Sequence, residues 1–152
     1  MKNFFAMIYE WLLYDQNYNL LFRQLYQGNG YLLLGLSMLF IPLLLFILYY
    51  WDSRLPWGSP YRKKYSWIIW LIISGAITVG VSYYAIIYPE LFKSNNPALI
   101  QALNTPQTGY IDFAERLLVN LSVLNGVYSL VTGFLWSLLL KQKSVLHIHI
   151  PF

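Results

Sequence analysis

Three long stretches of the chain consist mostly of apolar residues, and no charged residue interrupts any of them. They run from 31 to 50, from 66 to 88 and from 117 to 140. The hydrocarbon core of a bilayer is about 30 Å thick, and a helix of roughly 20 residues crosses it. The stretches lack the strict alternation of apolar and polar residues that marks the strands of a membrane barrel. The pattern therefore predicts three transmembrane helices.

The segment that precedes the first span is also apolar, over residues 4–14. As a helix it covers about 16 Å, which is too short to cross a bilayer. Extending it would bury Asp15 and Arg23. We therefore expect residues 1–27 to form an interfacial helical region along the membrane surface. A signal peptide is the alternative, and Glu10 inside the apolar run argues against it, as does the lack of a small-residue cleavage site.

Composition supports a membrane protein over a soluble one. The chain has 152 residues, of which 58% are hydrophobic and 11% charged, whereas soluble domains carry roughly 25% charged residues. With 0 Cys it has no disulfide, thiolate nucleophile or zinc–thiolate site. We expect an all-α integral membrane protein that forms one domain over residues 1–152 and ends in a short extended tail at 141–152.

The distribution of charge predicts an orientation. Loop 51–65 holds four basic residues against one acid, and tail 141–152 holds two against none, whereas 1–30 and 89–116 are nearly balanced. Positively charged loops stay in the cytoplasm. We expect a bacterial inner membrane protein with its N-terminus outside and its C-terminus in the cytoplasm.

The basic run of the first loop, Arg62, Lys63 and Lys64, stands just before a span. Its expected role is contact with anionic lipid headgroups. Nucleic-acid binding would need a larger basic surface, so we expect no nucleic-acid partner.

Small residues recur every three or four positions along the third span and share one helix face. They are Ser122, Gly126, Ser129 and Gly133, and Ala76 with Gly80 gives the second span a shorter version of the motif. Small residues let helix backbones approach closely in lipid. We favour packing among the spans of one chain over packing between subunits or a pore lining.

Asn120 and Asn125 are amides within this apolar helix. Each needs a hydrogen-bond partner in hydrocarbon, and a neighbouring helix is favoured over a water-filled pore. No Asp, Glu, Lys, Arg or His lies near the middle of a span, which argues against ion-coupled transporters and proton pumps.

Histidine and isoleucine alternate in the tail. On an extended chain His147 and His149 would lie on one side and Ile148 and Ile150 on the other, and Phe152 follows them. Two imidazoles could contribute to a metal site, but no nearby acid completes one. The alternation favours a docking peptide that adds a strand to a partner's sheet.

The acids of the outer segments, Glu90, Asp112 and Glu115, have no nucleophile, histidine or metal motif beside them. The chain also lacks GxSxG, HExxH and P-loop motifs. We therefore expect no enzyme activity, no cofactor and no metal. Asp112 and Glu115 resemble a capping box at the start of the third helix.

Three features carry a family resemblance: the tyrosine-rich start, the tryptophan- and lysine-bearing loop 51–65, and the C-terminal run His149-Ile-Pro-Phe152. Over most of its length the chain resembles small multi-span bacterial membrane proteins encoded beside contractile injection systems, such as type VI-like machines. The resemblance implies a membrane anchor or complex subunit, and it transfers no functional residues.

Two functions from different classes follow. The first is a non-enzymatic membrane subunit or anchor of a larger complex, with lipids and either its own copies or other protein subunits as partners. The alternative is a homo-oligomeric pore or channel-like effector, in which Asn120 and Asn125 would face water.

Overall fold

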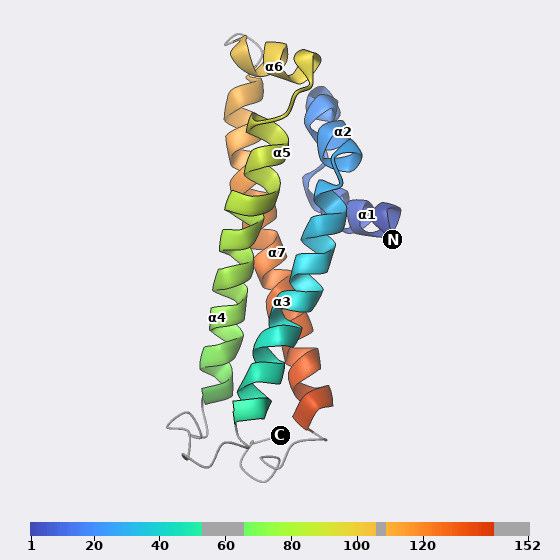
Figure 1. Ribbon diagram of the computed structural model, residues 1–152. Helices are drawn as coiled ribbons and strands as arrows, with labels where there is room; N and C mark the ends of the chain where they lie inside the picture. Colours follow the sequence, from blue (N-terminus) through green and yellow to red (C-terminus); the bar gives the residue numbers. More distant parts are fainter. Residues whose placement is uncertain (53–65, 106–108, 142–152) are drawn as a thin grey trace.

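Helices are the regular structure throughout the part of the chain that this computed structural model describes, residues 1–52, 66–105 and 109–141 (Figure 1). In chain order they are α1 (Lys2–Leu13), the 3₁₀ turn η1 (Gln16–Tyr18), α2 (Asn19–Gln27), α3 (Gly30–Asp52), α4 (Ser66–Val81), the π-helix η2 (Ser82–Ile87), α5 (Tyr88–Phe92), α6 (Pro97–Asn104) and α7 (Tyr110–Lys141).

Three helical segments are long and apolar enough to cross a membrane, which confirms the predicted fold class. They are Gly30–Tyr50, Trp67–Phe92 and Tyr110–Leu140. Figure 1 shows α3, the α4–α5 run and α7 side by side along the length of the molecule, with α2 and α6 at one end.

The third long helix begins at Tyr110, ahead of the apolar span predicted from 117 and two residues before the capping box predicted at Asp112 and Glu115, so Asp112 lies within its first turn. Its first turns are amphipathic: Asp112 and Glu115 are exposed, whereas Ala114 and Leu117 are buried. One side of this segment packs on the core, which favours a helix. The charged residues on its other side lower the hydropathy, so the apolar run that predicted the span does not include it. Phe113 stacks on the ring of Tyr18 with centroids 4.0 Å apart, which ties this end of α7 to the turn before α2.

The short N-terminal helix α1 docks on the bundle. Phe5 lies against Gly35 of α3, because a Cβ at Gly35 would collide with the Phe5 ring. Tyr9 is fully buried, and its ring stacks on that of Tyr31 with centroids 6.1 Å apart. The other side of α1 is open and apolar, with Trp11 83% exposed. The structure thus adds to the expected surface helix a packed side that the sequence did not predict.

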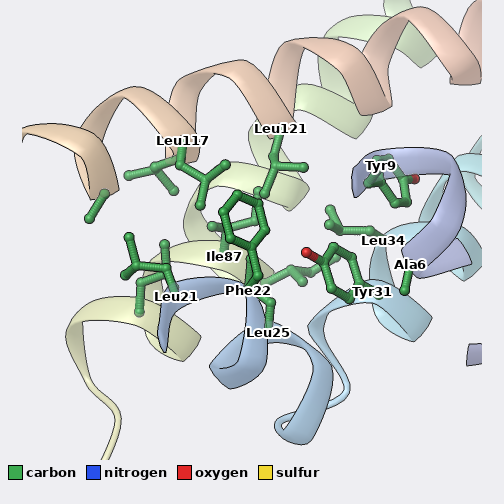
Figure 2. Close-up of a cluster of buried hydrophobic side chains, with 14 of the residues drawn as sticks. Ala6, Tyr9, Leu21, Phe22, Leu25, Tyr31, Leu34, Ile87, Leu117 and Leu121 are labelled. Carbon is green, nitrogen blue, oxygen red and sulfur yellow. The ribbon is translucent and has the colours of Figure 1, made fainter. Parts of the chain in front are cut away.

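The main core lies at the end of the bundle that carries α1, α2 and α6. Figure 2 shows Phe22 of α2 pointing toward Leu117 and Leu121 of α7, with Tyr31 and Tyr9 beside them. A second cluster fills the opposite end, with Phe46, Tyr49, Tyr50 and Trp67 as its buried members. The two clusters hold the long helices together at both ends.

Helix α6 covers the end of the bundle and is joined to α2. The Asn96 side chain accepts from Ala98 N at 3.2 Å and so caps the helix, and Pro97 occupies its first turn. Asn96 Nδ2 also donates to Gln24 Oε1 at 3.1 Å.

Candidate functional site: a polar seam inside the bundle

Asn125 of α7 is the centre of a hydrogen-bond network that joins four elements. Its side chain is fully buried. Its Oδ1 accepts from the hydroxyl of Tyr9 at 2.6 Å, and its Nδ2 donates to Ser37 Oγ at 2.9 Å and to Ser82 Oγ at 2.6 Å. Both amide hydrogens are therefore used within the chain, which removes the cost of burying them.

Asn125 belongs to a row of buried polar side chains between α4 and α7, which we name the polar seam. Its members are Ser74, Thr78, Ser82, Ser122, Asn125, Ser129 and Ser137. Thr78 Oγ1 and Ser129 Oγ lie 2.9 Å apart, and Ser137 Oγ lies 3.3 Å from the hydroxyl of Tyr50. Ser122 donates to a carbonyl of its own helix, at Leu118.

The π-helix η2 begins at a member of the seam. Ser82 Oγ donates to Thr78 O at 2.7 Å and accepts from Asn125. A π-helical segment is a local insertion in an α-helix, and such insertions often occur at functional positions. Here it lies where the second long helix meets the hub of the network.

A second set of hydrogen bonds repairs the backbone around Pro42, which lies inside α3. Proline has no N–H, so the carbonyl four residues earlier, Met38 O, loses its helical donor. Thr132 Oγ1 of α7 lies 2.6 Å from that oxygen. The next carbonyl, Leu39 O, accepts from Trp136 Nε1 at 3.1 Å. Thr132 thus supplies the donor that the proline removes, and Trp136 adds a second bond between the two helices at the next residue.

The structure places the four small residues of the third span on the buried side of α7, facing α3 and α4 of the same chain. They are Ser122, Gly126, Ser129 and Gly133. A Cβ at Gly126 would lie 3.3 Å from Gly75 O. A Cβ at Gly133 would lie 2.9 Å from Leu71 and 3.2 Å from Pro42. Both glycines therefore mark close approaches between helices.

The prediction that Ala76 and Gly80 are the packing residues of the second span was wrong, because a different side of the helix faces α7. Ala76 is exposed, and a Cβ at Gly80 would have no atom within 4 Å. Gly75 makes the contact instead, because a Cβ there would lie 2.8 Å from Leu130. Successive residues on a helix point about 100° apart, so neighbours 75 and 76 cannot share one face.

The fold does not bring the remaining residues that the sequence suggested as functional into one site. Asn120 is exposed on α7, away from Asn125, as are Asp112 and Glu115. Among the described residues no three His, Cys, Asp or Glu side chains form a group that could hold a metal ion. The basic residues Arg62, Lys63 and Lys64 and the tail residues His147, Ile148, His149, Ile150 and Phe152 lie outside the described residues.

Sequence reasoning missed several members of the network. Ser74, Thr78 and Ser82 recur every four residues on α4 and η2, and that spacing could have identified a polar face. Nothing in the sequence connects Tyr9 to Asn125. Chemically, the seam consists of hydroxyls and one amide that bond each other, neighbouring side chains or backbone carbonyls, so it fixes helix positions and is not suited to acid–base chemistry.

No family model, no curated protein and no solved structure matches this chain.

Proposed function

We propose that this chain is a non-enzymatic integral membrane subunit that anchors a larger membrane-associated complex. One observation carries the proposal: the side chains of the polar seam are buried, and each of them is hydrogen-bonded within one chain. The outward side of α7 is mostly apolar, with Val119, Val123, Val127 and Val131 between 48% and 55% exposed, and Asn120 is an exposed amide among them. Such a bundle is suited to lipid on its outside and needs no further copy to complete its interior.

The location and orientation are part of the same proposal. The excess of basic residues in loop 51–65 and tail 141–152 supports a cytoplasmic position for both. The N-terminal helices and α6 would then face the outside of a bacterial inner membrane. Given the family resemblance, the candidate assembly is a contractile injection system.

Partner binding is assigned to the tail. His147, Ile148, His149, Ile150 and Phe152 would add a strand to a cytoplasmic partner, which would cover their apolar side chains. Arg62, Lys63 and Lys64 would contact anionic lipid headgroups on the same side.

The test is to remove the residues after Lys143 and to replace them, in a control, by a Gly/Ser tail of equal length. Both proteins should insert and show the helix content of the full chain, since the seam lies elsewhere. Both should lose the partners that co-purify with the full chain from its own host. If the truncated protein retains the same partners, the tail does not bind them.

The pore alternative receives less support. It required Asn120 and Asn125 to face water. Asn120 is exposed, but the Asn125 amide is fully buried by its own chain and makes three hydrogen bonds. Conductance in planar bilayers separates the two functions, since an anchor should show none.

A further inference from the structure

A groove of about 470 Å³ lies between α1 and α2, on the outward side of the docked N-terminal helix. Its lining includes one acid, Glu10, and three aromatic residues, Trp11, Tyr14 and Tyr26. Ala6 supplies part of the apolar wall. A carboxylate among aromatic rings is the arrangement that recognises ammonium groups in proteins.

Glu10 is half-buried. None of the Lys or Arg side chains that the structure describes forms an ion pair with it, and the contact that affects its charge comes from the hydroxyl of Tyr31. Burial raises the pKa of Glu10, and the Tyr31 hydroxyl opposes this to a smaller extent. A partly desolvated carboxylate of this kind gains free energy from a cationic ligand.

The rings of the groove are accessible. Trp11 is 83% exposed, Tyr14 45% and Tyr26 38%. The Tyr26 ring already interacts with a cation, because Lys2 Nζ lies 4.6 Å from its centroid. Exposed tryptophan and tyrosine are typical of the membrane–water boundary, where one end of the side chain is apolar and the other wet.

The depth of α1 along the first span places the groove near that boundary. Phe5 lies against Gly35, and Tyr9 contacts both Tyr31 and Met38 of α3. At a rise of 1.5 Å per residue, the α3 residues of these contacts lie within about 12 Å of Gly30, where the span begins. The groove extends from these positions, in the outer half of the hydrocarbon core, to Tyr26 of α2, which precedes the span, so it meets acyl chains at one end and lipid headgroups at the other.

We propose that this groove binds a phospholipid with an ammonium headgroup, of the phosphatidylethanolamine type. The ammonium contacts the Glu10 carboxylate and the faces of Trp11 and Tyr14. Lys2 lies over the Tyr26 ring at the edge of the groove, where its charge also stabilises the Glu90 carboxylate, and it supplies the positive charge that suits the headgroup phosphate. The opposite charges of Glu10 and Lys2 match a zwitterionic headgroup better than an anionic one. This inference needs the membrane location but not the anchor role.

The test uses the full chain purified in mild detergent, supplied with either phosphatidylethanolamine or phosphatidylglycerol, and native mass spectrometry of the retained lipid. The wild type should retain phosphatidylethanolamine about 5-fold more than phosphatidylglycerol, as expected for a cation–π contact with a carboxylate beside it. Glu10→Gln should reduce this preference to near equality. The matched control Glu115→Gln removes an exposed acid from α7 and should keep the preference.

A second pair of variants avoids any folding effect of Glu10. Trp11→Leu changes a highly exposed ring of the groove and should weaken the preference, whereas Tyr84→Leu changes a ring that is 75% exposed on η2 and should not. Equal retention of the two lipids by the wild type would overturn the proposal. So would an unchanged preference in both Glu10→Gln and Trp11→Leu, or a cross-link from Glu10 to a lysine of a second copy in protein that shows no lipid preference.

Discussion

Thr132 Oγ1 of α7 lies 2.6 Å from the carbonyl oxygen of Met38 in α3, the carbonyl that Pro42 leaves without its helical donor. The same hydroxyl has weaker alternatives on its own helix, at 3.1 Å from Tyr128 O and 3.2 Å from Ser129 O. The contact with Met38 O therefore fixes the height of α7 against α3. It pairs the carbonyl that lacks a helical donor in one span with a side chain 94 residues later in the chain.

Replacing Thr132 by valine keeps the shape of the side chain and removes its hydroxyl. We expect the free energy of unfolding to fall by about 1 kcal/mol, within the range for hydrogen bonds between membrane helices. Thr132→Ser keeps the donor and is the control. Unfolding by SDS in mixed micelles, followed by circular dichroism, measures the stability of both variants. Equal stability of the valine variant and the wild type would show that the Thr132 hydroxyl does not compensate for Pro42.

Pro42→Ala provides an independent check, because alanine restores an N–H that can bond Met38 O within α3. In the Pro42→Ala background, Thr132→Val should cost less than in the wild type. A double-mutant cycle reports this coupling. Strictly additive effects would show that Thr132 does not compensate for Pro42.

The amide of Asn125 should be the most costly polar group of the seam to remove. Asn125→Ala removes the oxygen that accepts from the Tyr9 hydroxyl, whereas Ser37 and Ser82 keep their bonds to backbone carbonyls. A buried group left unsatisfied in this way costs about 1–3 kcal/mol. Asn120→Ala on the exposed side of α7 should change stability by less than about 0.5 kcal/mol. Thermal unfolding of the two variants in the same detergent makes the comparison, and similar melting temperatures would argue against the hub.

Gly133→Leu should disrupt the approach of α7 to α3, since even a Cβ there would lie 3.2 Å from Pro42 and 3.3 Å from Phe46. Overpacking of this kind costs about 1–3 kcal/mol. Gly80→Leu is the matched control, because a Cβ at Gly80 has no atom within 4 Å. We would read an unchanged melting temperature and oligomer size for Gly133→Leu as evidence against close packing at this face.

Stability should depend on pH through Glu10. Burial raises the pKa of this carboxyl in the folded protein, so the folded state binds the proton more tightly than the unfolded chain does. The free energy of unfolding should therefore fall as pH rises from the ordinary glutamate value near 4.5 through the raised value. Burial also disfavours the charged form of Glu90, which adds a slope of the same sign, so Glu10→Gln should reduce the slope and Glu115→Gln should keep it. Melting temperatures across the acidic range test the sign, and a rise with pH would contradict it.

The helices were predictable from sequence because each span is a continuous apolar run. The start of α7 was predicted only approximately. Asp112 and Glu115 interrupt the hydropathy signal while Ala114 and Leu117 still pack inward, and the capping-box pattern placed the start two residues after Tyr110, where the helix begins. The face of α7 that carries Gly126 and Gly133 was also predictable, since helical spacing alone defines a face.

The partners of that face could not be predicted from spacing. Which residues of α4 meet α7 depends on the rotation of α4 about its axis, and Gly75 instead of Ala76 faces α7. The bond between Tyr9 and Asn125 joins residues 116 positions apart through the docking of α1, and no local pattern in the sequence encodes it.

Native mass spectrometry of the tagged protein, extracted from its own host's membranes in mild detergent, tests the central claim most directly. An anchor with a self-contained bundle should appear with unrelated proteins in a fixed ratio, and Asn125→Ala should lower its stability without changing that composition. A closed ring of identical chains, without other subunits and with conductance in bilayers, would contradict the account.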